Sequence, residues 1–440
     1  MSYSVPGTVQ ALRAALEESG AALPIAESAA SLTAPCAVGG REAHNRIAYQ
    51  AMEGCDGTAA GAPDELTCRR YLRFAHGGPG IIWFEATAVC QEGRANPRQL
   101  YLTEQTLDGF QRLVEQIKET SLRENGFAPL IFCQLTHSGR YSKPNGFPEP
   151  LIAYSNPLFE GDRPIEKDRI LSDDDLDRIG DALAQGAALA QRAGFDGADI
   201  KCCHRYLLSE LLSAYTRPGK YGGSFENRTR LLRESVEKAV AGRSGGFLIG
   251  SRLNIYDGFP YPYGFGVSEE SGLAPVLTEP VRLAGMLQQA GLDILNITMG
   301  NPYVNPHVNR PFAMGPYAAP EHPACGVERM LTGTREVRKA LSIPVICSGL
   351  SWLGAPSVNV AAACVSESWF DFAGYGRETL ADPDLARRIT QTGALDRAHT
   401  CVACGKCSEL MRAGGTPGCI VRDSGLYAPL YRQFVTERRK

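Results

Sequence analysis

Short apolar runs alternate with longer amphipathic segments along most of this chain. The runs are rich in β-branched residues, and strands that are buried on both faces of a parallel sheet have this composition. Eight such runs cover residues 46–52, 80–89, 128–137, 195–202, 247–254, 292–299, 343–350 and 370–377. We expect these runs to form the strands of one parallel sheet.

The segments between the runs carry apolar residues three and four positions apart, as in helices that pack one face against a sheet. The third of them is the clearest, because Ser172 is a favourable N-cap, acidic residues follow it, and Gly194 comes after Arg192 at the other end. A shorter amphipathic helix is expected around Leu12 and Leu16. The predicted helices between strands cover residues 65–78, 106–125, 172–194, 226–242, 278–291 and 327–342.

Eight strand–helix units predict an α/β fold that closes into a (β/α)8 TIM barrel with a C-terminal four-cysteine segment. A doubly wound open sheet is the alternative, but it usually carries a glycine-rich phosphate-binding turn, and no GxGxxG motif follows any strand here. We divide the chain into an N-terminal extension with a short helix (1–44), the barrel (45–395) and the cysteine segment with its tail (396–440). Insertions at 138–171 and 256–277 follow strand ends, where barrel enzymes build their sites.

Composition narrows the class of protein. Hydrophobic residues make up 44% and charged residues 21% of the chain, as in ordinary globular proteins, and the net charge of −3 gives no basic surface for nucleic acid. No apolar run is long enough to span a membrane, and the N-terminus lacks the pattern of a secretory signal. We therefore expect a cytoplasmic protein that acts on a small molecule.

Polar and glycine residues stand where the predicted strands end, and in a closed barrel these ends face one mouth. Charged side chains there are costly to bury without a partner, so a polar ligand is expected. Phosphate sites of barrels form after the seventh and eighth strands, where the glycines alternatively serve only as tight turns. The strand-end residues are Met52, Ala86, Gln134, His137, Lys201, His204, Arg252, Met299, Ser348, Gly349, Gly376 and Arg377.

The segment after the fourth strand is the densest in chemistry. Lys201, His204 and Tyr206 place a cation, an imidazole and a phenol within six residues. Such a set can bind a carbonyl or carboxylate oxygen and donate a proton, and a phenol with a pKa of about 10 suits a strongly basic carbanion. In the alternative interpretation Tyr206 packs on the leucines that follow it and Lys201 is a solvated charge at the rim.

Four of the 14 cysteines lie together near the C-terminus, whereas most of the others stand singly in apolar runs. Cys401, Cys404, Cys407 and Cys419 have the spacing CxxCxxCx11C. Four thiolates make a soft-ligand cage for an iron–sulfur cluster or for zinc. The CxxCxxC run resembles that of ferredoxins, so a [4Fe–4S] cluster is favoured over zinc. His399 is a nearby candidate ligand, although a lone histidine is more often a surface residue.

The motifs NRIAYQAM, FEATAV, QLTHSGR, AGFDGADI, HRYLL, KYGGSFENRTRL and GYGRETLADPDL together resemble the old yellow enzyme family of FMN-dependent ene-reductases. The resemblance runs from Asn45 to Asp423 and is closest to the branch that contains 2,4-dienoyl-CoA reductase. It implies FMN at the barrel mouth and reduction of an activated C=C bond in an enone or enoate. NAD(P)H or an external electron donor would supply the electrons.

The resemblance also implies roles for the cofactor-binding residues. Gln134 matches the glutamine at the flavin pyrimidine ring, and Arg252 matches the arginine beside flavin N1 and O2. Ala86 matches the backbone position near N5, and Met52 belongs to the first-strand motif at the flavin. The positions that match the phosphate binders are Gly349, Gly376 and Arg377.

In the same resemblance Tyr206 protonates the substrate α-carbon after hydride passes from flavin N5 to the β-carbon. His204 keeps the second member of the pair that binds the substrate oxygen. Lys201 replaces the first member, usually histidine, and this replacement indicates an anionic acceptor such as a carboxylate. The insertions and residues 300–312 are expected to line the substrate.

Three departures from the family pattern stand out. Ala51 replaces the usual first-strand proline, and Glu53 close behind it can donate to the flavin O4 edge only if it is protonated. Two residues rather than three separate Cys404 from Cys407. The dienoyl-CoA reductases continue into FAD- and NADPH-binding domains, which this sequence lacks after Cys419.

Several alternatives therefore stay open. An electron-donor protein or subunit feeds the cluster, or the cluster is structural and NAD(P)H reduces FMN directly, or the cysteines hold zinc. The alternative activities are a flavin-dependent amine or other dehydrogenase or demethylase with FMN and a cluster, a catalytically silent electron-transfer module, and a flavin-free lyase of the aldolase type.

Overall fold

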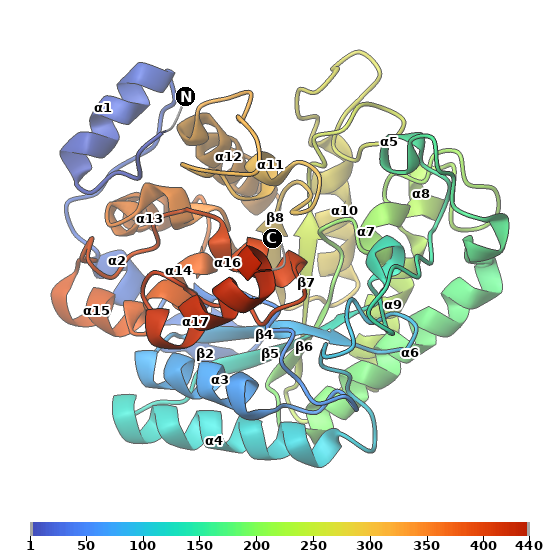
Figure 1. Ribbon diagram of the computed structural model, residues 1–440, viewed down its shortest axis with the longest axis horizontal. Coiled ribbons are helices and arrows are strands. Elements are labelled where there is room, and N and C mark those ends of the chain that lie inside the picture. The colour runs from blue at the N-terminus through green and yellow to red at the C-terminus, as the bar shows by residue number, and fades with distance from the viewer. Residues whose placement is uncertain (1–2, 438–440) are drawn as a thin grey trace.

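The computed structural model describes residues 3–437 and contains the eight predicted strands in one parallel sheet, ordered β10-β3-β4-β5-β6-β7-β8-β9. A bridge between Ile346 and Phe372 joins the two outer strands, and Cys347 N donates to Phe372 O at 3.1 Å. The sheet is therefore closed, and the predicted TIM barrel is confirmed (Figure 1). The strands are β3 Ile47–Tyr49, β4 Ile81–Ala88, β5 Leu130–Thr136, β6 Gly197–Ile200, β7 Leu248–Asn254, β8 Ile294–Thr298, β9 Val345–Ile346 and β10 Ala373–Tyr375.

Helices follow the strands and surround the barrel, as the amphipathic segments predict. The N-cap of α6 is confirmed, because Ser172 Oγ accepts from Asp175 N and the Asp175 carboxylate accepts from Ser172 N. The helix expected over 226–242 is divided into α8 and α9 at Thr229, whose hydroxyl donates to Phe225 O. The main helices are α3 Glu65–Gly77, α4 Leu107–Asn125, α6 Asp173–Arg192, α8 Phe225–Arg228, α9 Arg230–Gly242, α10 Thr278–Gln289, α12 Pro323–Lys339, α13 Ser357–Ser366 and α15 Leu385–Thr392.

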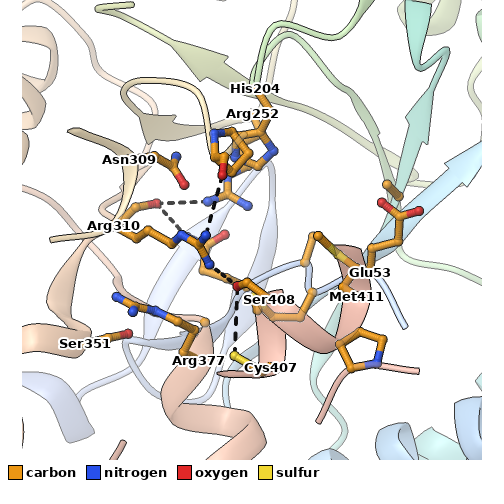
Figure 2. Close-up of a pocket in the computed structure, with 18 of the residues that line it drawn as sticks. Glu53, His204, Arg252, Asn309, Arg310, Ser351, Arg377, Cys407, Ser408 and Met411 are labelled. Atoms are coloured by element: carbon orange, nitrogen blue, oxygen red, sulfur yellow. Dashed lines mark hydrogen bonds between the residues drawn. The ribbon is translucent and has the colours of Figure 1, made fainter. Parts of the chain in front are cut away.

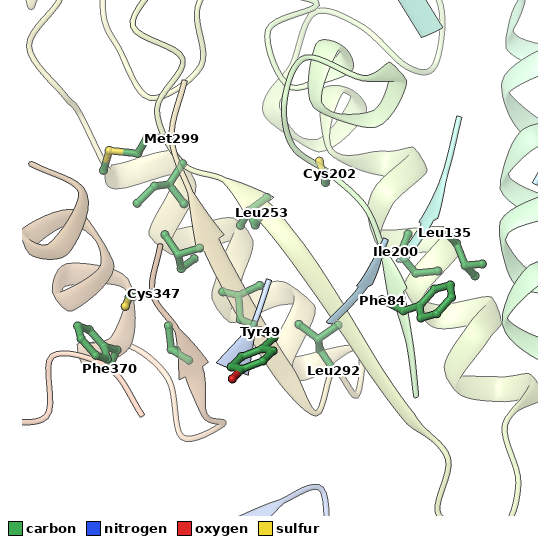
Figure 3. Packing of buried hydrophobic residues seen from close by; sticks show 14 of the residues in the cluster. Tyr49, Phe84, Leu135, Ile200, Cys202, Leu253, Leu292, Met299, Cys347 and Phe370 are labelled. Atoms are coloured by element: carbon green, nitrogen blue, oxygen red, sulfur yellow. The ribbon is translucent and has the colours of Figure 1, made fainter. Parts of the chain in front are cut away.

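The main core lies between the strands and these helices. Phe84, Leu135 and Leu253 on the strands are fully buried in it (Figure 3). Burial of one such side chain contributes about 1.5–3 kcal/mol. Cys133 and Cys347 are buried in the same layer, as expected for cysteines that act as small hydrophobic residues.

A small hairpin that the sequence pattern did not predict closes the N-terminal end of the barrel. Its strands are β1 (Cys36–Val38) and β2 (Arg41–Ala43), paired antiparallel. Val38 and Ala43 pack in one buried cluster with Trp83 and Phe132 from the barrel interior. The expected N-terminal helix is α1 (Val9–Ser19), and α2 (Ala30–Thr33) follows it.

The opposite end of the barrel carries the long loops and the cysteine segment. Asp423 of this segment accepts hydrogen bonds from Arg69 at 2.8 Å and Arg73 at 2.6 Å, so the segment is fixed to α3 (Figure 1). Among the described residues, no helix combines the length and apolar character that a membrane crossing would need. The short helices at this end are α5 Pro157–Glu160, α7 Leu207–Leu211, α11 Pro306–Asn309, α14 Arg377–Ala381, α16 Lys406–Arg412 and α17 Ser424–Tyr431.

Candidate active site

The strand ends surround one cavity at the C-terminal mouth of the barrel. Its volume, with the open mouth included, is about 1070 Å³, which suits a cofactor together with a small substrate. The residues that the sequence assigned to the flavin, its phosphate, the substrate oxygen and proton transfer line it, as do four residues of 300–312, whereas no residue of the insertions 138–171 and 256–277 does. The assigned residues are Met52, Ala86, Gln134, Lys201, His204, Tyr206, Arg252, Gly349, Gly376 and Arg377.

A buried carboxylate fixes the floor of the cavity. Asp199 on β6 accepts hydrogen bonds from Trp83 Nε1 and Gln134 Nε2, both at 2.6 Å, and from Arg252 N at 2.7 Å. Burial raises the pKa of Asp199. The amide nitrogen of Gln134 is thus held from below, and its amide oxygen is the atom left for a ligand.

Arg252 is a buried cation with little compensation. Its side chain is held by one hydrogen bond, from Nη2 to Ser348 Oγ at 3.3 Å, and its Nε is buried without a hydrogen-bond partner. Burial lowers the pKa of Arg252. A buried guanidinium in this state requires an anion or an acceptor-rich ring, so the position fits the electron-rich edge of a reduced flavin.

A β-bulge presents the backbone of Ala86 to the cavity. The register of β4 against β5 shifts between Phe84 and Thr87, and bulges of this kind are frequent beside active sites. Glu85 of the bulge accepts from Gly54 N at 2.6 Å and pairs with Arg70 at 2.5 Å. This network holds the loop after β3 against the cavity mouth.

Two arginines, Arg310 and Arg377, define an anion site on the side of the cavity that is formed by the segments after β8 and β10. Gly349 has a φ of +89°, which a non-glycine residue rarely adopts, and Arg377 begins α14 at the end of β10. Arg310 comes from the segment after β8, within residues 300–312, which were expected to line the substrate and not the phosphate. Burial and the charge of Arg377 lower the pKa of Arg310 to about 10. Paired guanidinium groups are typical of phosphate binding, so the site fits a phosphomonoester.

The turn that carries His204 and Tyr206 has an unusual backbone. His204 and Arg205 have φ values of +64° and +58°, a conformation that costs a non-glycine residue about 1 kcal/mol or more. Arg205 compensates, because its buried guanidinium pairs with Asp257 Oδ2 at 2.8 Å and donates to Tyr154 Oη at 3.3 Å. The ion pair with Asp257 and the hydrogen bond to Tyr154 tie this turn to the two long insertions.

Tyr206 has a defined set of neighbours. Its Oη lies 2.8 Å from Tyr303 Oη and donates to Glu53 Oε2 at 3.3 Å. Lys201 Nζ lies 3.7 Å from the centre of the Tyr206 ring. Burial raises the pKa of Tyr206 and lowers that of His204 well below its usual range, so the phenol keeps its proton and the imidazole is neutral.

The four cysteines line one small pocket beside the cavity. Backbone N–H groups point at two of the sulfurs, from Ala403 to Cys401 Sγ at 3.4 Å and from Arg422 to Cys419 Sγ at 3.3 Å. Among residues 3–437, no three metal-ligating side chains are close enough to hold a single ion. The four thiols therefore share one space, with amide donors at two of the sulfurs.

Other contacts place the cysteine pocket against the cavity. Cys407 lines both spaces. Figure 2 shows Arg310 between Arg252 and Ser408, and Arg310 donates to Ser408 Oγ. His399 is exposed and hydrogen-bonded to Asp396 at 3.1 Å, outside the lining of the pocket.

The Arg205–Asp257 pair gives a prediction about stability. Asp257→Asn leaves a buried guanidinium without its counter-charge, and we expect a loss of about 3 kcal/mol in the free energy of unfolding. Thermal and denaturant unfolding measure the loss. Asp181→Asn, at an exposed ion pair with Lys238, should cost less than about 1 kcal/mol. An equal effect of the two substitutions contradicts the role of the pair.

A closed barrel with this cavity defines a barrel oxidoreductase of the flavin-binding type. The model of the NADH:flavin oxidoreductase / NADH oxidase family matches residues 31–304, and the chain belongs to that family. The predicted resemblance to old yellow enzymes and the assignment as an oxidoreductase are confirmed. Membership of this family implies FMN as the flavin and a nicotinamide as the hydride donor.

Similar proteins differ in length and in activity. The chain is 25% identical over 420 residues to the NADH oxidase of Thermoanaerobacter brockii, with 91% of this chain and 58% of the relative covered. It is 25% identical over 407 residues to the 4,4'-dithiodibutanoate disulfide reductase of Rhodococcus erythropolis, with 90% and 96% covered. The chain thus spans little more than half of one relative and nearly all of the other.

Solved structures share the fold. A complex of 2-naphthoyl-CoA reductase superposes with a TM-score of 0.72 at 21% identity, covering 89% of this chain and 57% of that one. The old yellow enzyme homologue of Zymomonas mobilis gives 0.61 at 22% identity, with 83% and 94% covered. Histamine dehydrogenase from Rhizobium sp. 4-9 gives 0.66 at 20% identity, with 89% and 52% covered.

Proposed function

We propose that this protein reduces an activated C=C bond, in an enone or an enoate, with FMN in the cavity at the barrel mouth. FMN, when bound, supplies the hydride. The observation that carries the proposal is the Tyr206 phenol, held in the same cavity as the residues that fit the flavin. A protonated, buried phenol is suited to a carbanion formed after hydride transfer.

The cofactor-binding roles follow the chemistry of the wall. Gln134 and Arg252 would bind the pyrimidine edge, and the bulge at Ala86 would present its backbone to the central ring. Met52 would pack against the ring system. Phosphate would lie on the N–H groups and charges at Gly349, Gly376, Arg377 and Arg310.

The remaining polar groups suit the substrate. Neutral His204 can donate a hydrogen bond to a carbonyl or carboxylate oxygen. Lys201 adds a compact positive charge that has no counterpart in the usual histidine pair. Tyr206 Oη gives its proton to the α-carbon, so the substrate gains a hydride and a proton across the double bond.

Lys201 favours an anionic acceptor over an amine. FMN would take up Arg252, Arg310 and Arg377 of the lining, so Lys201 is the cation that remains for the substrate, together with the carboxyl group of Glu53. Its charge would attract an enoate and repel a protonated amine. A catalytically silent barrel would have no need for a buried phenol with two hydrogen-bonding partners.

We further propose that Cys401, Cys404, Cys407 and Cys419 hold a [4Fe–4S] cluster. The shared pocket and the amide donors at two sulfurs support a cluster over zinc. Electrons would come from NAD(P)H or from an external donor protein or subunit. The division into an extension (1–44), a barrel (45–395) and a cysteine segment (396–440) belongs to the same proposal.

The test uses protein purified without oxygen. Its flavin is reduced and then mixed with enones, enoates and amines, and flavin reoxidation is followed by absorbance. Reoxidation by enones or enoates supports the proposal. Reduction of oxidised flavin by an amine, with no response to alkenes, would establish the dehydrogenase instead.

Lys201 gives a prediction about specificity. Lys201→Met removes the charge but keeps a chain of similar length, and we expect the KM for enoates to rise about tenfold, which corresponds to about 1.4 kcal/mol. The KM for neutral enones should change less than twofold. Lys238→Met, at an exposed ion pair, is the matched control. A KM that is unchanged for both substrate classes rejects carboxylate recognition by Lys201.

A further inference from the structure

Three loops bring three acidic hydroxyl or carboxyl groups together on the cavity wall. Glu53 follows β3, Tyr206 follows β6 and Tyr303 follows β8. Tyr206 Oη is the centre of the group, 2.8 Å from Tyr303 Oη and 3.3 Å from Glu53 Oε2. The proton donor of the proposed reaction is therefore one member of a hydrogen-bonded chain.

We propose that Glu53 resupplies the proton that Tyr206 gives to the substrate, an inference that rests on the proposed function. In the first step the Tyr206 O–H bond breaks and a C–H bond forms at the α-carbon, while the hydride comes from reduced flavin. The Glu53 Oε2–H bond then breaks, and its proton restores the Tyr206 hydroxyl. The Glu53 carboxylate takes a proton from solvent before the next turnover.

The hydrogen bonds of Glu53 determine which of its two carboxyl oxygens carries a proton. Asn96 Nδ2 donates to Glu53 Oε1 at 3.0 Å, so Oε1 acts as an acceptor. Tyr206 Oη donates to Oε2, so a proton that the carboxyl group takes up lies on Oε2 and reverses this hydrogen bond, with Oε2–H then donating to Tyr206 Oη. The other titratable groups that act on Glu53 or on its hydrogen-bonded chain are Lys201, Tyr303, Cys55 and Tyr141.

The environment also makes the carboxyl group of Glu53 easier to protonate. Burial raises the pKa of Glu53, and the charge of Lys201 and the hydrogen bonds of Tyr206 and Asn96 oppose that rise. The result is an acid that is more readily protonated near neutral pH than an exposed glutamate. It is also far more acidic than the Tyr206 phenol, so transfer of its proton to the phenolate is downhill.

Glu53 lies between the buried donor and the protein surface. Tyr206 is 2% exposed, whereas Glu53 and Asn96 are half-buried, and the exposed residues Pro97 and Arg98 follow Asn96 directly. Glu53 is therefore the more exposed of the two hydrogen-bonded groups and the better placed to take up a proton from solvent. Tyr303, which is half-buried like Glu53, can donate to the Tyr206 phenolate and stabilise it until the proton arrives.

The test separates the first turnover from the later ones. Glu53→Gln keeps the shape and can still accept from Asn96, but its amide cannot release a proton. In stopped-flow experiments we expect the first reoxidation of reduced flavin by an enone within about twofold of wild type. Steady-state turnover should fall by about 10²-fold, the lower end of the contribution of a positioned proton donor, with a larger solvent isotope effect.

Matched variants make the result specific. Glu53→Asp should recover part of the turnover, and Glu104→Gln, at an exposed ion pair with Arg192, should turn over like wild type. In a Tyr206→Phe background, Glu53→Gln should cause no additional loss. The flavin content and melting temperature of each variant confirm that it is folded.

Two outcomes overturn the inference while wild type still reduces alkenes. One is a Glu53→Gln variant with unchanged steady-state turnover and isotope effect. The other is an equal loss in the first and later turnovers, which indicates a structural role for Glu53. If wild-type protein reduces no enone or enoate at all, the proposed function itself fails. Wild-type protein is therefore assayed first, before any variant is compared.

Discussion

Tyr206→Phe should lower the rate at which an enone reoxidises the reduced flavin by about 10²–10⁴-fold, the usual contribution of a positioned general acid. The substitution removes only Oη, so the ring remains in place under Lys201 Nζ, 3.7 Å from its centre. Reduction of the flavin by NAD(P)H needs no proton from Tyr206 and should keep its wild-type rate. Stopped-flow absorbance measures the two half-reactions separately.

A matched tyrosine provides the control for this experiment. Tyr215 donates to Glu279 at 3.4 Å and lies outside the lining of the cavity. Tyr215→Phe should leave both half-reactions within about twofold of wild type. Alkene reduction by Tyr206→Phe at the wild-type rate would remove Tyr206 from the mechanism and leave His204 as the next donor to examine.

The barrel was predictable because its strands are buried on both faces and are therefore continuously apolar. The same rule explains what the pattern missed. Helix α13 is apolar on all sides, with Val358, Ala361 and Cys364 fully or almost fully buried, so it has no amphipathic period to detect. The β1–β2 hairpin has strands of three residues, too short for an alternating pattern. Its Gly39-Gly40 turn was the available signal.

The residues of the site also divide into those that the sequence pattern could predict and those that it could not. Residues at strand ends could be predicted, because closure of the barrel brings every carboxyl end to one mouth. The contributions of Glu53, Tyr303 and Arg310 depend on how loops fold back over that mouth. Periodicity carries no information on such loops. The role of Arg310, a half-buried residue between Asn309 and Pro311, is detectable only once Arg377 and Ser408 are seen beside it.

Cys407→Ala should remove the iron from this protein. A proposed cluster site that loses one of its four thiolates should not retain the cluster, and Cys407 is the one of the four cysteines that also lines the barrel-mouth cavity. We expect about four iron atoms per chain in wild type and almost none in the variant. Iron and sulfide analysis and the visible spectrum of anaerobically purified protein measure the change.

The control for the iron analysis is a cysteine at the opposite end of the barrel. Cys36→Ala alters a half-buried thiol in the β1–β2 hairpin and should retain the wild-type iron content. If wild-type protein contained one zinc per chain and no iron or sulfide, the four cysteines would form a structural zinc site and not a cluster. Equal iron in wild type and in Cys407→Ala would exclude Cys407 as a ligand.

The same variant decides what the cluster is for. If the cluster passes electrons, Cys407→Ala loses flavin reduction by a one-electron donor, while hydride transfer from NAD(P)H continues. If the cluster is only structural, both routes keep their rates and the melting temperature falls, because metal binding stabilises the fold that forms the site. The first result is favoured, because Cys407 lines both spaces together with Arg377 and Leu380 and the two spaces therefore share one wall.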